Sequence, residues 1–233
     1  MLSVIIVAAG SSRRMGFDKL FAQINGRPVL WHSIRAFASL EAVDEVIVVT
    51  QSERASQVEG LLREATDHKR VQVVEGGAER HLSVWEGLKA VSSKSGRFVA
   101  IHDGARPLIT AAAINGCLEI AGKEGAACCA APIPDTVKRA NDQGVVVESV
   151  DRTGLWAMQT PQIFSLELIH LAYVKLMEER KMPTDEVSAV EGIGAKVALV
   201  QNADWNFKIT FPKDIEMAAQ VLSLRSQQTG VQL

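Results

Sequence analysis

Runs of aliphatic and β-branched residues alternate with helical periodicity over the first half of the chain. The run at 4–7 contains no polar side chain, as expected of a strand buried on both faces of a sheet. The pattern predicts strands at 4–7, 43–50, 70–77 and 125–133, a strand within 97–107 that runs into a loop, and helices from Pro28 and at 52–66, 79–92 and 110–122. Strands that alternate with helices indicate parallel βαβ units, so we expect an α/β, Rossmann-like fold with a mostly parallel twisted sheet and helices on both faces.

The pattern changes at 135–164, where short β runs surround a polar turn at Asn141–Gly144 and no helical period is found. We predict a β-hairpin arm at about 134–156 that projects from a single domain spanning 1–233. Because an isolated hairpin is marginally stable and its edges invite pairing, we expect this arm to join two copies of the chain. Beyond it the pattern predicts helices at 165–180 and 184–193, strands at 196–201 and 207–210, a final helix from Pro212 and a frayed tail from about Ser226.

The composition is that of an ordinary globular protein, with 47% hydrophobic and 22% charged residues among 233. A formal net charge of −2 gives no electrostatic footprint for duplex nucleic acid, so any basic cluster marks a local site. No apolar run reaches the roughly 18 residues of a membrane span. The three cysteines lack zinc spacing and are expected to be buried, reduced thiols. These features favour a cytoplasmic protein without nucleic-acid or membrane partners.

A basic loop follows the first predicted strand, in the stretch VAAGSSRRMGFDK at residues 7–19. It has neither the Walker A pattern nor the G-x-G-x-x-G fingerprint. Gly10 is free to adopt backbone angles closed to other residues, and consecutive N–H groups in such a loop can form an anion site. The Arg14 guanidinium matches phosphate oxygens in shape, and Lys19 supplies a compact charge. The loop therefore predicts a triphosphate site; the alternative is a solvated loop whose basic side chains face water.

A glycine pair opens the stretch GGAERHLSV at residues 76–84, after the third predicted strand. Gly76 and Gly77 would let the backbone approach a flat ring closely, and Ser83 could hydrogen-bond a base or ribose. The alternative is an ordinary turn from a strand into a helix. Ligands of parallel sheets bind beyond the carboxyl ends of the strands, where this stretch and the basic loop both fall.

A carboxylate and a late lysine complete the candidate chemistry. In HDGARP at 102–107, Asp103 lies just beyond a buried strand and could bind Mg²⁺ through oxygen, with Arg106 close by. The alternative is a structural Asp–Arg pair. In NFKITFP at 206–212, Lys208 is placed on a predicted strand, where an edge-strand lysine is the alternative.

The ordered set of motifs resembles one family over essentially the whole chain. The motifs are AAGSSRRM, GGAERHLSV, HDGARP, DTVK, DRTGLW, TPQIF, TDEVSAVE and NFKIT. They are similar to those of the 2-C-methyl-D-erythritol 4-phosphate cytidylyltransferases of the non-mevalonate isoprenoid pathway. Each motif is weak alone, and their order and spacing carry the resemblance. Two departures are the absence of a proline before Lys19 and the presence of Ala78 where an acidic residue is frequent.

The resemblance implies a nucleotide-binding fold, CTP and a polyol phosphate as substrates, Mg²⁺, and a homodimer joined through the β-arm. It implies catalytic roles for Arg14, Lys19 and Lys208. It implies nucleotide contacts from Ala8, Ala9, Gly10, Gly77, Arg80, Ser83 and Asp103, the last also near the metal. It implies acceptor contacts from Arg106, Thr136, Arg152 and Thr160, with Thr136 and Arg152 reaching from the neighbouring subunit.

The reaction implied is attack of an acceptor phosphate on the α-phosphorus of CTP, with release of pyrophosphate. A phosphate monoester with a second pKa of about 6 is largely dianionic at pH 7, so no general base is required. His102, although beside Asp103, is therefore expected to be a buried structural residue. Three alternatives are a ribitol-5-phosphate cytidylyltransferase, a non-catalytic nucleotide-binding protein of the same fold, and a dinucleotide-dependent oxidoreductase. The missing glycine fingerprint disfavours the last.

Overall fold

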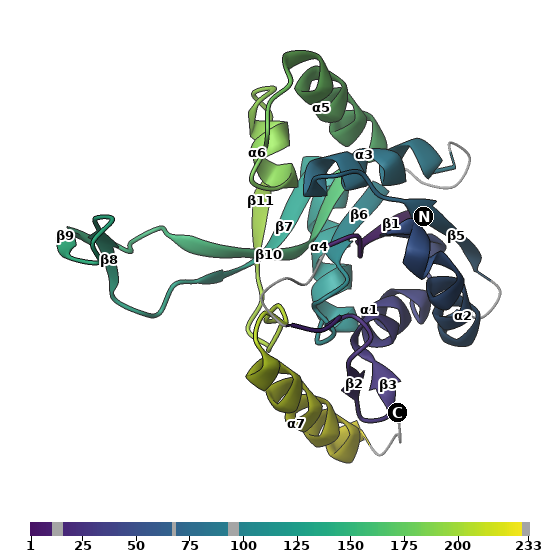
Figure 1. Cartoon of the computed structure of the whole chain (residues 1–233). Helices are drawn as coiled ribbons and strands as arrows, with labels where there is room; N and C mark the ends of the chain where they lie inside the picture. The colour runs from purple at the N-terminus through teal and green to yellow at the C-terminus, as the bar shows by residue number, and fades with distance from the viewer. Residues whose placement is uncertain (11–15, 67–68, 93–97, 230–233) are drawn as a thin grey trace.

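The computed structural model describes residues 1–10, 16–66, 69–92 and 98–229. Its centre is a seven-stranded sheet in the order β11-β7-β10-β6-β1-β4-β5 (Figure 1). The strands of this sheet are β1 Leu2–Val7, β4 Val43–Thr50, β5 Arg70–Glu75, β6 Phe98–Asp103, β7 Ala126–Pro132, β10 Trp156–Ser165 and β11 Ala198–Gln201. The pairs β1–β4, β1–β6, β4–β5 and β7–β11 are parallel. The mostly parallel α/β class predicted from the sequence is confirmed.

Helices cover both faces of this sheet, as predicted (Figure 1). They are α1 Val29–Ala38, α2 Ala55–Ala65, α3 Arg80–Ala90, α4 Ala111–Glu124, α5 Leu166–Glu179, α6 Glu186–Glu191 and α7 Pro212–Thr229, with a short 3-10 turn, η1, at Ser52–Arg54. The buried side chains of α1, α2, α4 and α7 share one hydrophobic cluster, and those of α3, α5 and α6 share the other. Each cluster therefore lies on its own side of the sheet.

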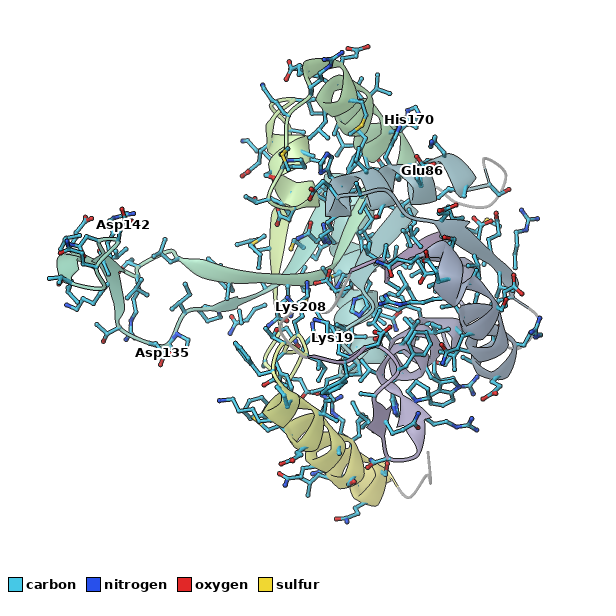
Figure 2. The ribbon with its side chains drawn as sticks, viewed as in Figure 1. Lys19, Glu86, Asp135, Asp142, His170 and Lys208 are labelled. Atoms are coloured by element: carbon cyan, nitrogen blue, oxygen red, sulfur yellow. The ribbon has the colours of Figure 1, made fainter. Side chains whose placement is uncertain are left out.

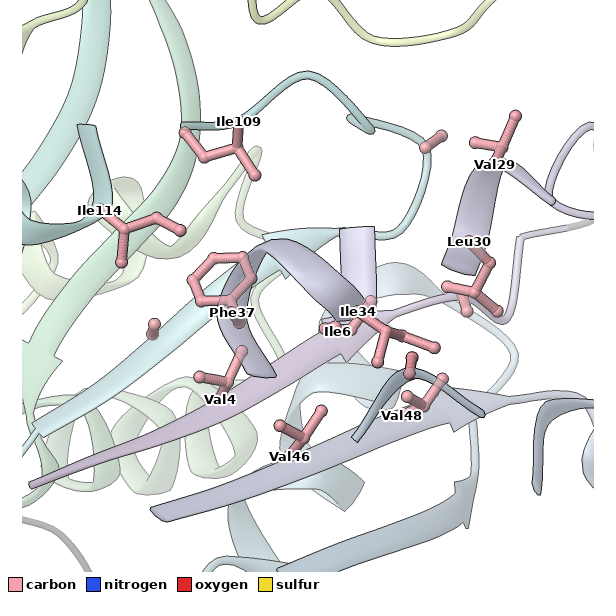
Figure 3. Packing of buried hydrophobic residues seen from close by; sticks show 14 of the residues in the cluster. Val4, Ile6, Val29, Leu30, Ile34, Phe37, Val46, Val48, Ile109 and Ile114 are labelled. Atoms are coloured by element: carbon pink, nitrogen blue, oxygen red, sulfur yellow. The ribbon is translucent and has the colours of Figure 1, made fainter. Parts of the chain in front are cut away.

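Alternating side chains of β1 feed the two clusters. Val4 and Ile6 point into the first cluster, against Ile34 and Phe37 of α1, and Ile5 belongs to the second (Figure 3). All five side chains are fully buried. Burying such a side chain stabilises the fold by about 1.5–3 kcal/mol. The uninterrupted apolar run of β1 is thus explained by its central place in a sheet covered on both sides.

Local signals set the helix ends as well as the helix faces. The Thr110 hydroxyl accepts a hydrogen bond from the Ala113 backbone N–H, 3.3 Å away, at the start of α4. Gly125, with φ of 83°, ends the same helix in the left-handed conformation that favours glycine. The next residue begins β7, so the direction of the chain is reset within one residue.

The β-hairpin arm is present and projects away from the sheet (Figure 1). It consists of β8 Val137–Ala140 and β9 Val146–Val150, paired antiparallel, and its turn is held by the Asn141 side chain. The short β run that the sequence shows after the arm, up to residue 164, belongs to the central sheet. Residues 156–165 form β10, which inserts antiparallel between β6 and β7. Polar residues and Pro161 weaken the strand signal of β10 in the sequence, and the pairing register shifts between Met158 and Gln162.

Two further expectations fail near the C-terminus. Residues 207–210 form no strand. The backbone N–H groups of Ile209 and Thr210 instead bond the Ala105 carbonyl at 2.8 Å and the Asp214 carboxylate at 2.7 Å. The tail predicted to fray from Ser226 is helical through Thr229, because Leu222 anchors that end of α7 in the core.

A small hairpin, β2 Gln23–Ile24 with β3 Arg27–Pro28, was missed. Its Asn-Gly turn, with φ of 49° and 80°, is a signal that sequence reasoning could have used.

Candidate active site

A cavity of about 610 Å³ opens at the carboxyl ends of the parallel strands. That volume is typical of a site for a small molecule. The residues that line it are Val7, Ala8, Ala9, Gly10, Lys19, Leu20, Gln51, Gly77, Ala78, Glu79, Arg80, Ser83, Asp103, Ala105, Lys208 and Thr210. Figure 2 shows Lys19 and Lys208 near one another at the centre of the molecule, although 189 positions separate them. The structure thus brings together the two described ends of the basic loop, Gly77, Asp103 and Lys208.

The end of β1 is held tightly between its neighbours. The Ala8 backbone N–H donates to the Val49 carbonyl at 2.7 Å, and the Val7 carbonyl accepts from the Gly104 N–H at 3.0 Å. A Cβ at Gly76 would lie 2.6 Å from the Ala9 Cβ and 2.8 Å from the Ser83 Oγ. Glycine at 76 is therefore required for packing of the loop against the end of β1, a reason the sequence alone did not indicate.

Asp103 is the electrostatic centre of the cavity. Its carboxylate lies 3.0 Å from the Lys208 Nζ, 3.3 Å from the Arg106 Nε and 3.4 Å from the Arg80 Nη2. Burial alone would raise the pKa of Asp103, but Lys208, Arg80 and Arg106 outweigh it and hold the pKa well below its usual range. Asp103 is therefore ionised at neutral pH and orients three cations that reach it from three segments.

Arg80 is shared between Asp103 and a second buried carboxylate, Glu186. The guanidinium makes two bonds to Glu186, at 2.6 and 3.0 Å, and the Tyr173 hydroxyl donates to the same carboxylate at 3.1 Å. Burial alone would lower the pKa of Arg80, but the negative charges of Glu186 and Asp103 outweigh burial and raise this pKa above its usual value. Glu186 itself is fully buried at the start of α6. Glu186 lies in the TDEVSAVE motif, but its contact with Arg80 was not predicted from the sequence.

We expect Glu186→Gln to lower the free energy of unfolding by about 1.5–3 kcal/mol and to weaken nucleotide binding. The neutral amide cannot balance the buried guanidinium, so Arg80 loses its fixed position beside Asp103. Glu191→Gln, on the exposed end of the same helix, is the matched control. Urea unfolding of both variants measures the difference, and equal stability of the two would contradict the role given to Glu186.

His102 and Thr160 form a directed hydrogen-bond chain behind Asp103. The Thr160 hydroxyl accepts from the Asp103 backbone N–H at 3.1 Å and donates to the His102 Nδ1 at 3.0 Å. The His102 Nε2 then donates to the Arg106 carbonyl at 3.1 Å. Burial lowers the pKa of His102 to about 4, so its ring is neutral at pH 7. The prediction of a buried His102 is confirmed, and its contacts hold the loop that carries Asp103 and Arg106.

Several predicted residues do not line the cavity. Arg106 and Thr160 lie behind Asp103 and touch it directly, and Arg106 also donates to the Asn206 carbonyl at 2.7 Å. Thr136 and Arg152 are exposed on the arm, where the Arg152 guanidinium donates to the Pro134 carbonyl. Arg14 lies outside the described residues. Gln51, which follows β4 at the same sheet edge, lines the cavity and could have been predicted from that position.

Two carboxylate residues, Glu79 and Asp103, are among the described residues that line the cavity. Within the described ranges, no group of three or more His, Cys, Asp or Glu residues is placed to hold a metal. Asp103 lines the cavity and is ionised, and Mg²⁺ sites with nucleotides commonly combine one or two carboxylates with phosphate oxygens and water. Asp103 therefore fits as a protein ligand of a nucleotide-bound Mg²⁺.

The sheet and the cation-rich cavity at its strand ends define the class of α/β nucleotidyltransferases. The chain belongs to the 2-C-methyl-D-erythritol 4-phosphate cytidylyltransferase family: the family model, described as IspD, matches residues 2–224. It is therefore related to enzymes of isoprenoid synthesis. In the part of the chain that the structure describes, no helix is long and apolar enough to cross a membrane.

Individual relatives agree over nearly the full length. The cytidylyltransferase of Bacillus mycoides is 40% identical over 229 residues, which are 97% of this chain and 100% of that protein. The Caldanaerobacter subterraneus protein of the same name is 42% identical over 220 residues, 93% of this chain and 96% of that one. The crystal structure of 4-diphosphocytidyl-2C-methyl-D-erythritol synthase from Anaerococcus prevotii superposes with a TM-score of 0.83 at 30% identity, covering 96% of this chain and 98% of that one.

Proposed function

We propose that this enzyme transfers the cytidylyl group of CTP to 2-C-methyl-D-erythritol 4-phosphate, giving 4-diphosphocytidyl-2-C-methyl-D-erythritol and pyrophosphate. The observation that carries the proposal is the convergence of Lys19, Lys208 and Asp103 in one cavity. The attacking atom is a phosphate oxygen of the acceptor, which is mostly dianionic at pH 7 and needs no base. His102 supports this reading, because both ring nitrogens are engaged and its ring is neutral.

Charge neutralisation is the main task of the site. Two charges about 4 Å apart repel by roughly 4 kcal/mol at an effective dielectric of about 20, and two polyanions must meet here. Lys19 and Lys208 stabilise the reacting α-phosphate, and Arg14 stabilises the leaving pyrophosphate. Preorganised cations of this kind act where charge develops in the transition state. The roles of Lys19 and Lys208 follow the matched motifs and the shared cavity, and the role of Arg14 follows its motif alone.

The nucleotide is assigned to the strand ends. Backbone N–H groups of Ala9 and Gly10 cradle the triphosphate, whereas Ala8 lines the cavity with its own N–H already bonded to the Val49 carbonyl. Gly77, Arg80 and Ser83 form the cytidine pocket. Asp103 holds Mg²⁺ together with the nucleotide phosphates. The bound Mg²⁺ would supply Lewis-acid neutralisation of phosphate oxygens. Asp103 also keeps Lys208 and Arg80 in place through its ion pairs with them.

We further propose a homodimer in which the arm of one subunit completes the acceptor site of the other. The arm exposes Val145, Val146 and Val147 at 57%, 60% and 58%, an apolar surface that favours burial against a partner. Thr136 and Arg152 would bind the acceptor from the partner subunit. Arg106 and Thr160 of the first subunit touch Asp103 and do not line the cavity, so they are not assigned a contact with the acceptor. Three free, buried thiols are in keeping with the reducing cytoplasm as the location.

Arg152→Ala is expected to raise KM for the acceptor about tenfold or more and to leave CTP affinity unchanged, because a charge-assisted phosphate contact is lost. Steady-state kinetics with each substrate varied in turn measures the split. Arg139→Ala, on the same arm, is the control, because Arg139 is exposed and pairs with the exposed Glu148 at 2.9 Å. A loss of CTP affinity instead would contradict the assignment of Arg152 to the acceptor.

Subunit mixing tests the arm separately. Lys19→Ala and Arg152→Ala subunits, each defective alone, should recover activity when mixed, because one site of the mixed dimer has both residues. Absence of recovery in verified mixed dimers would exclude a role for the arm in the partner's site.

The decisive assay measures pyrophosphate release from CTP with 2-C-methyl-D-erythritol 4-phosphate, with and without Mg²⁺. ATP, GTP and UTP in parallel report base selectivity. Ribitol 5-phosphate in place of the acceptor tests the nearest competing activity. CTP binding without pyrophosphate release under all conditions would instead indicate a non-catalytic nucleotide-binding protein.

A further inference from the structure

Arg54 joins the two stems of the basic loop. Arg54 is the last residue of η1, the short turn that follows β4. Its Nη1 donates to the Gly10 carbonyl at 3.1 Å. Its Nε lies 2.7 Å from Asp18 Oδ2. The Arg54 and Asp18 side chains are only 17% and 27% exposed, so the pair is partly shielded from solvent. One guanidinium thus links two points eight residues apart in the chain, on either side of 11–15.

The contact at Gly10 fixes a part of the cavity wall that packing does not hold. Among the described residues, no heavy atom lies within 4 Å of the position that a Cβ of Gly10 would occupy. A carbonyl oxygen carries partial negative charge and repels a phosphate that it faces. The Gly10 carbonyl is bound to the Arg54 guanidinium, so this oxygen does not face an anion that enters the cavity, although Gly10 lines the cavity.

The contact at Asp18 fixes the backbone around Lys19. Asp18 Oδ1 accepts from the Leu20 backbone N–H at 3.1 Å, while Oδ2 pairs with Arg54. Lys19, between these two residues, donates from Nζ to the Ile209 carbonyl at 2.7 Å. The carboxylate is therefore a bridge between Arg54 and the start of the segment that carries Lys19.

Arg54 also balances charge. Asp18 is one residue from Lys19 and would weaken attraction of the site for phosphate if its charge were left uncompensated. The partly buried ion pair cancels that charge, and interactions shielded from water are less screened by salt. Lys19 and Lys208 therefore keep their full effect on an anion in the cavity.

We propose that Arg54 is a positioning residue for the polyphosphate end of the nucleotide, acting through Gly10 and Asp18. Arg54 itself is absent from the cavity lining among the described residues, so it is not assigned a direct contact with substrate. The inference rests on the proposed use of CTP. It predicts that Arg54 affects CTP, which carries three phosphates, far more than CMP or the acceptor.

Calorimetric titration of CTP and of CMP, without acceptor, tests the proposal on the full-length protein. Arg54→Ala should weaken CTP binding about tenfold, as expected for loss of charge-assisted bonds, and change CMP binding less than about twofold. KM for the acceptor should stay unchanged. Arg63→Ala, an exposed arginine on the following helix α2, makes the same charge change and should bind CTP like the wild type.

A double-mutant cycle with Asp18→Ala separates positioning from direct contact. If Arg54 acts through Asp18, Arg54→Ala should cost a smaller factor in the Asp18→Ala background than in the wild type. An equal cost would mean that Arg54 does not act through Asp18 and would overturn the proposal, as would equal losses for CTP and CMP or no loss at all. Asp18→Ala alone gives the same comparison of CTP and CMP should Arg54→Ala fail to fold. A wild-type protein that does not bind CTP would remove the proposed function itself, whereas an unaffected Arg54→Ala variant would remove only this inference.

Discussion

Lys19→Ala is expected to lower kcat by roughly 10²–10³-fold, the loss typical of removing one preorganised group that stabilises transition-state charge. The side chain lines the cavity, and its Nζ is held by the Ile209 carbonyl beside Lys208. The ammonium is therefore in place before substrate arrives and needs little reorganisation. Because charge on the α-phosphate oxygens grows between ground state and transition state, kcat should fall more than CTP affinity.

The fold should survive this change. Lys19 is partly exposed, and the loss of its charge-assisted bond to Ile209 removes about 1.5–3 kcal/mol of stability, less than the total stability of a typical domain. Single-turnover rates at saturating CTP, with thermal unfolding of the same samples, measure the two quantities. Lys19→Arg should recover part of the rate, since it keeps the charge, and Lys196→Ala, at an exposed position, should react like the wild type. An active Lys19→Ala enzyme would refute the catalytic role.

The sequence predicted the parts of the fold in which local pattern and environment agree. Buried parallel strands such as β1 and β4 are continuous apolar runs, and the helices between them repeat at helical spacing. The place of β10 in the central sheet was not predicted, because this antiparallel strand carries Gln159, Pro161 and Gln162 in its middle. The strand predicted at 207–210 is wrong for the opposite reason. Its side chains alternate as in a strand, but its backbone N–H groups bond a loop carbonyl and the Asp214 carboxylate.

The candidate site divides in the same way. Residues at strand ends, such as Gly10, Gly77 and Asp103, could be predicted because parallel strands bring their carboxyl ends to one edge. The residues that hold the site in place, Glu186 and Arg54, could not be predicted from the sequence. Glu186 is 106 positions from Arg80, and Arg54 is 36 positions from Asp18, so only the packed fold reveals these pairs. Asp18, which departs from the family's proline, proves to have a defined partner.

Asp103→Asn should disable the enzyme and destabilise the fold together. One carboxylate faces Lys208, Arg106 and Arg80, and the isosteric amide keeps its shape while removing its charge. The three cations would then repel one another with less compensation. Breaking a buried ion pair costs about 3–5 kcal/mol, so we expect a loss of that order in the free energy of unfolding. Lys208 would also lose the contact that directs it into the cavity, and turnover should fall with it.

The pH dependence identifies charge as the cause. The folded-state pKa of Asp103 is held below its unfolded value, so its stabilising effect is complete above about pH 4, the unfolded pKa, and is lost as pH falls toward the folded pKa. Protonated aspartic acid resembles asparagine. The stability difference between wild type and Asp103→Asn should thus be full at pH 7 and narrow below about pH 4. Asp142→Asn, on the exposed turn of the arm (Figure 2), is the control and should unfold like the wild type. Urea unfolding from pH 7 down to pH 3 measures the difference; a gap that stays constant with pH would mean that shape, and not the shared negative charge, holds Lys208, Arg106 and Arg80 together.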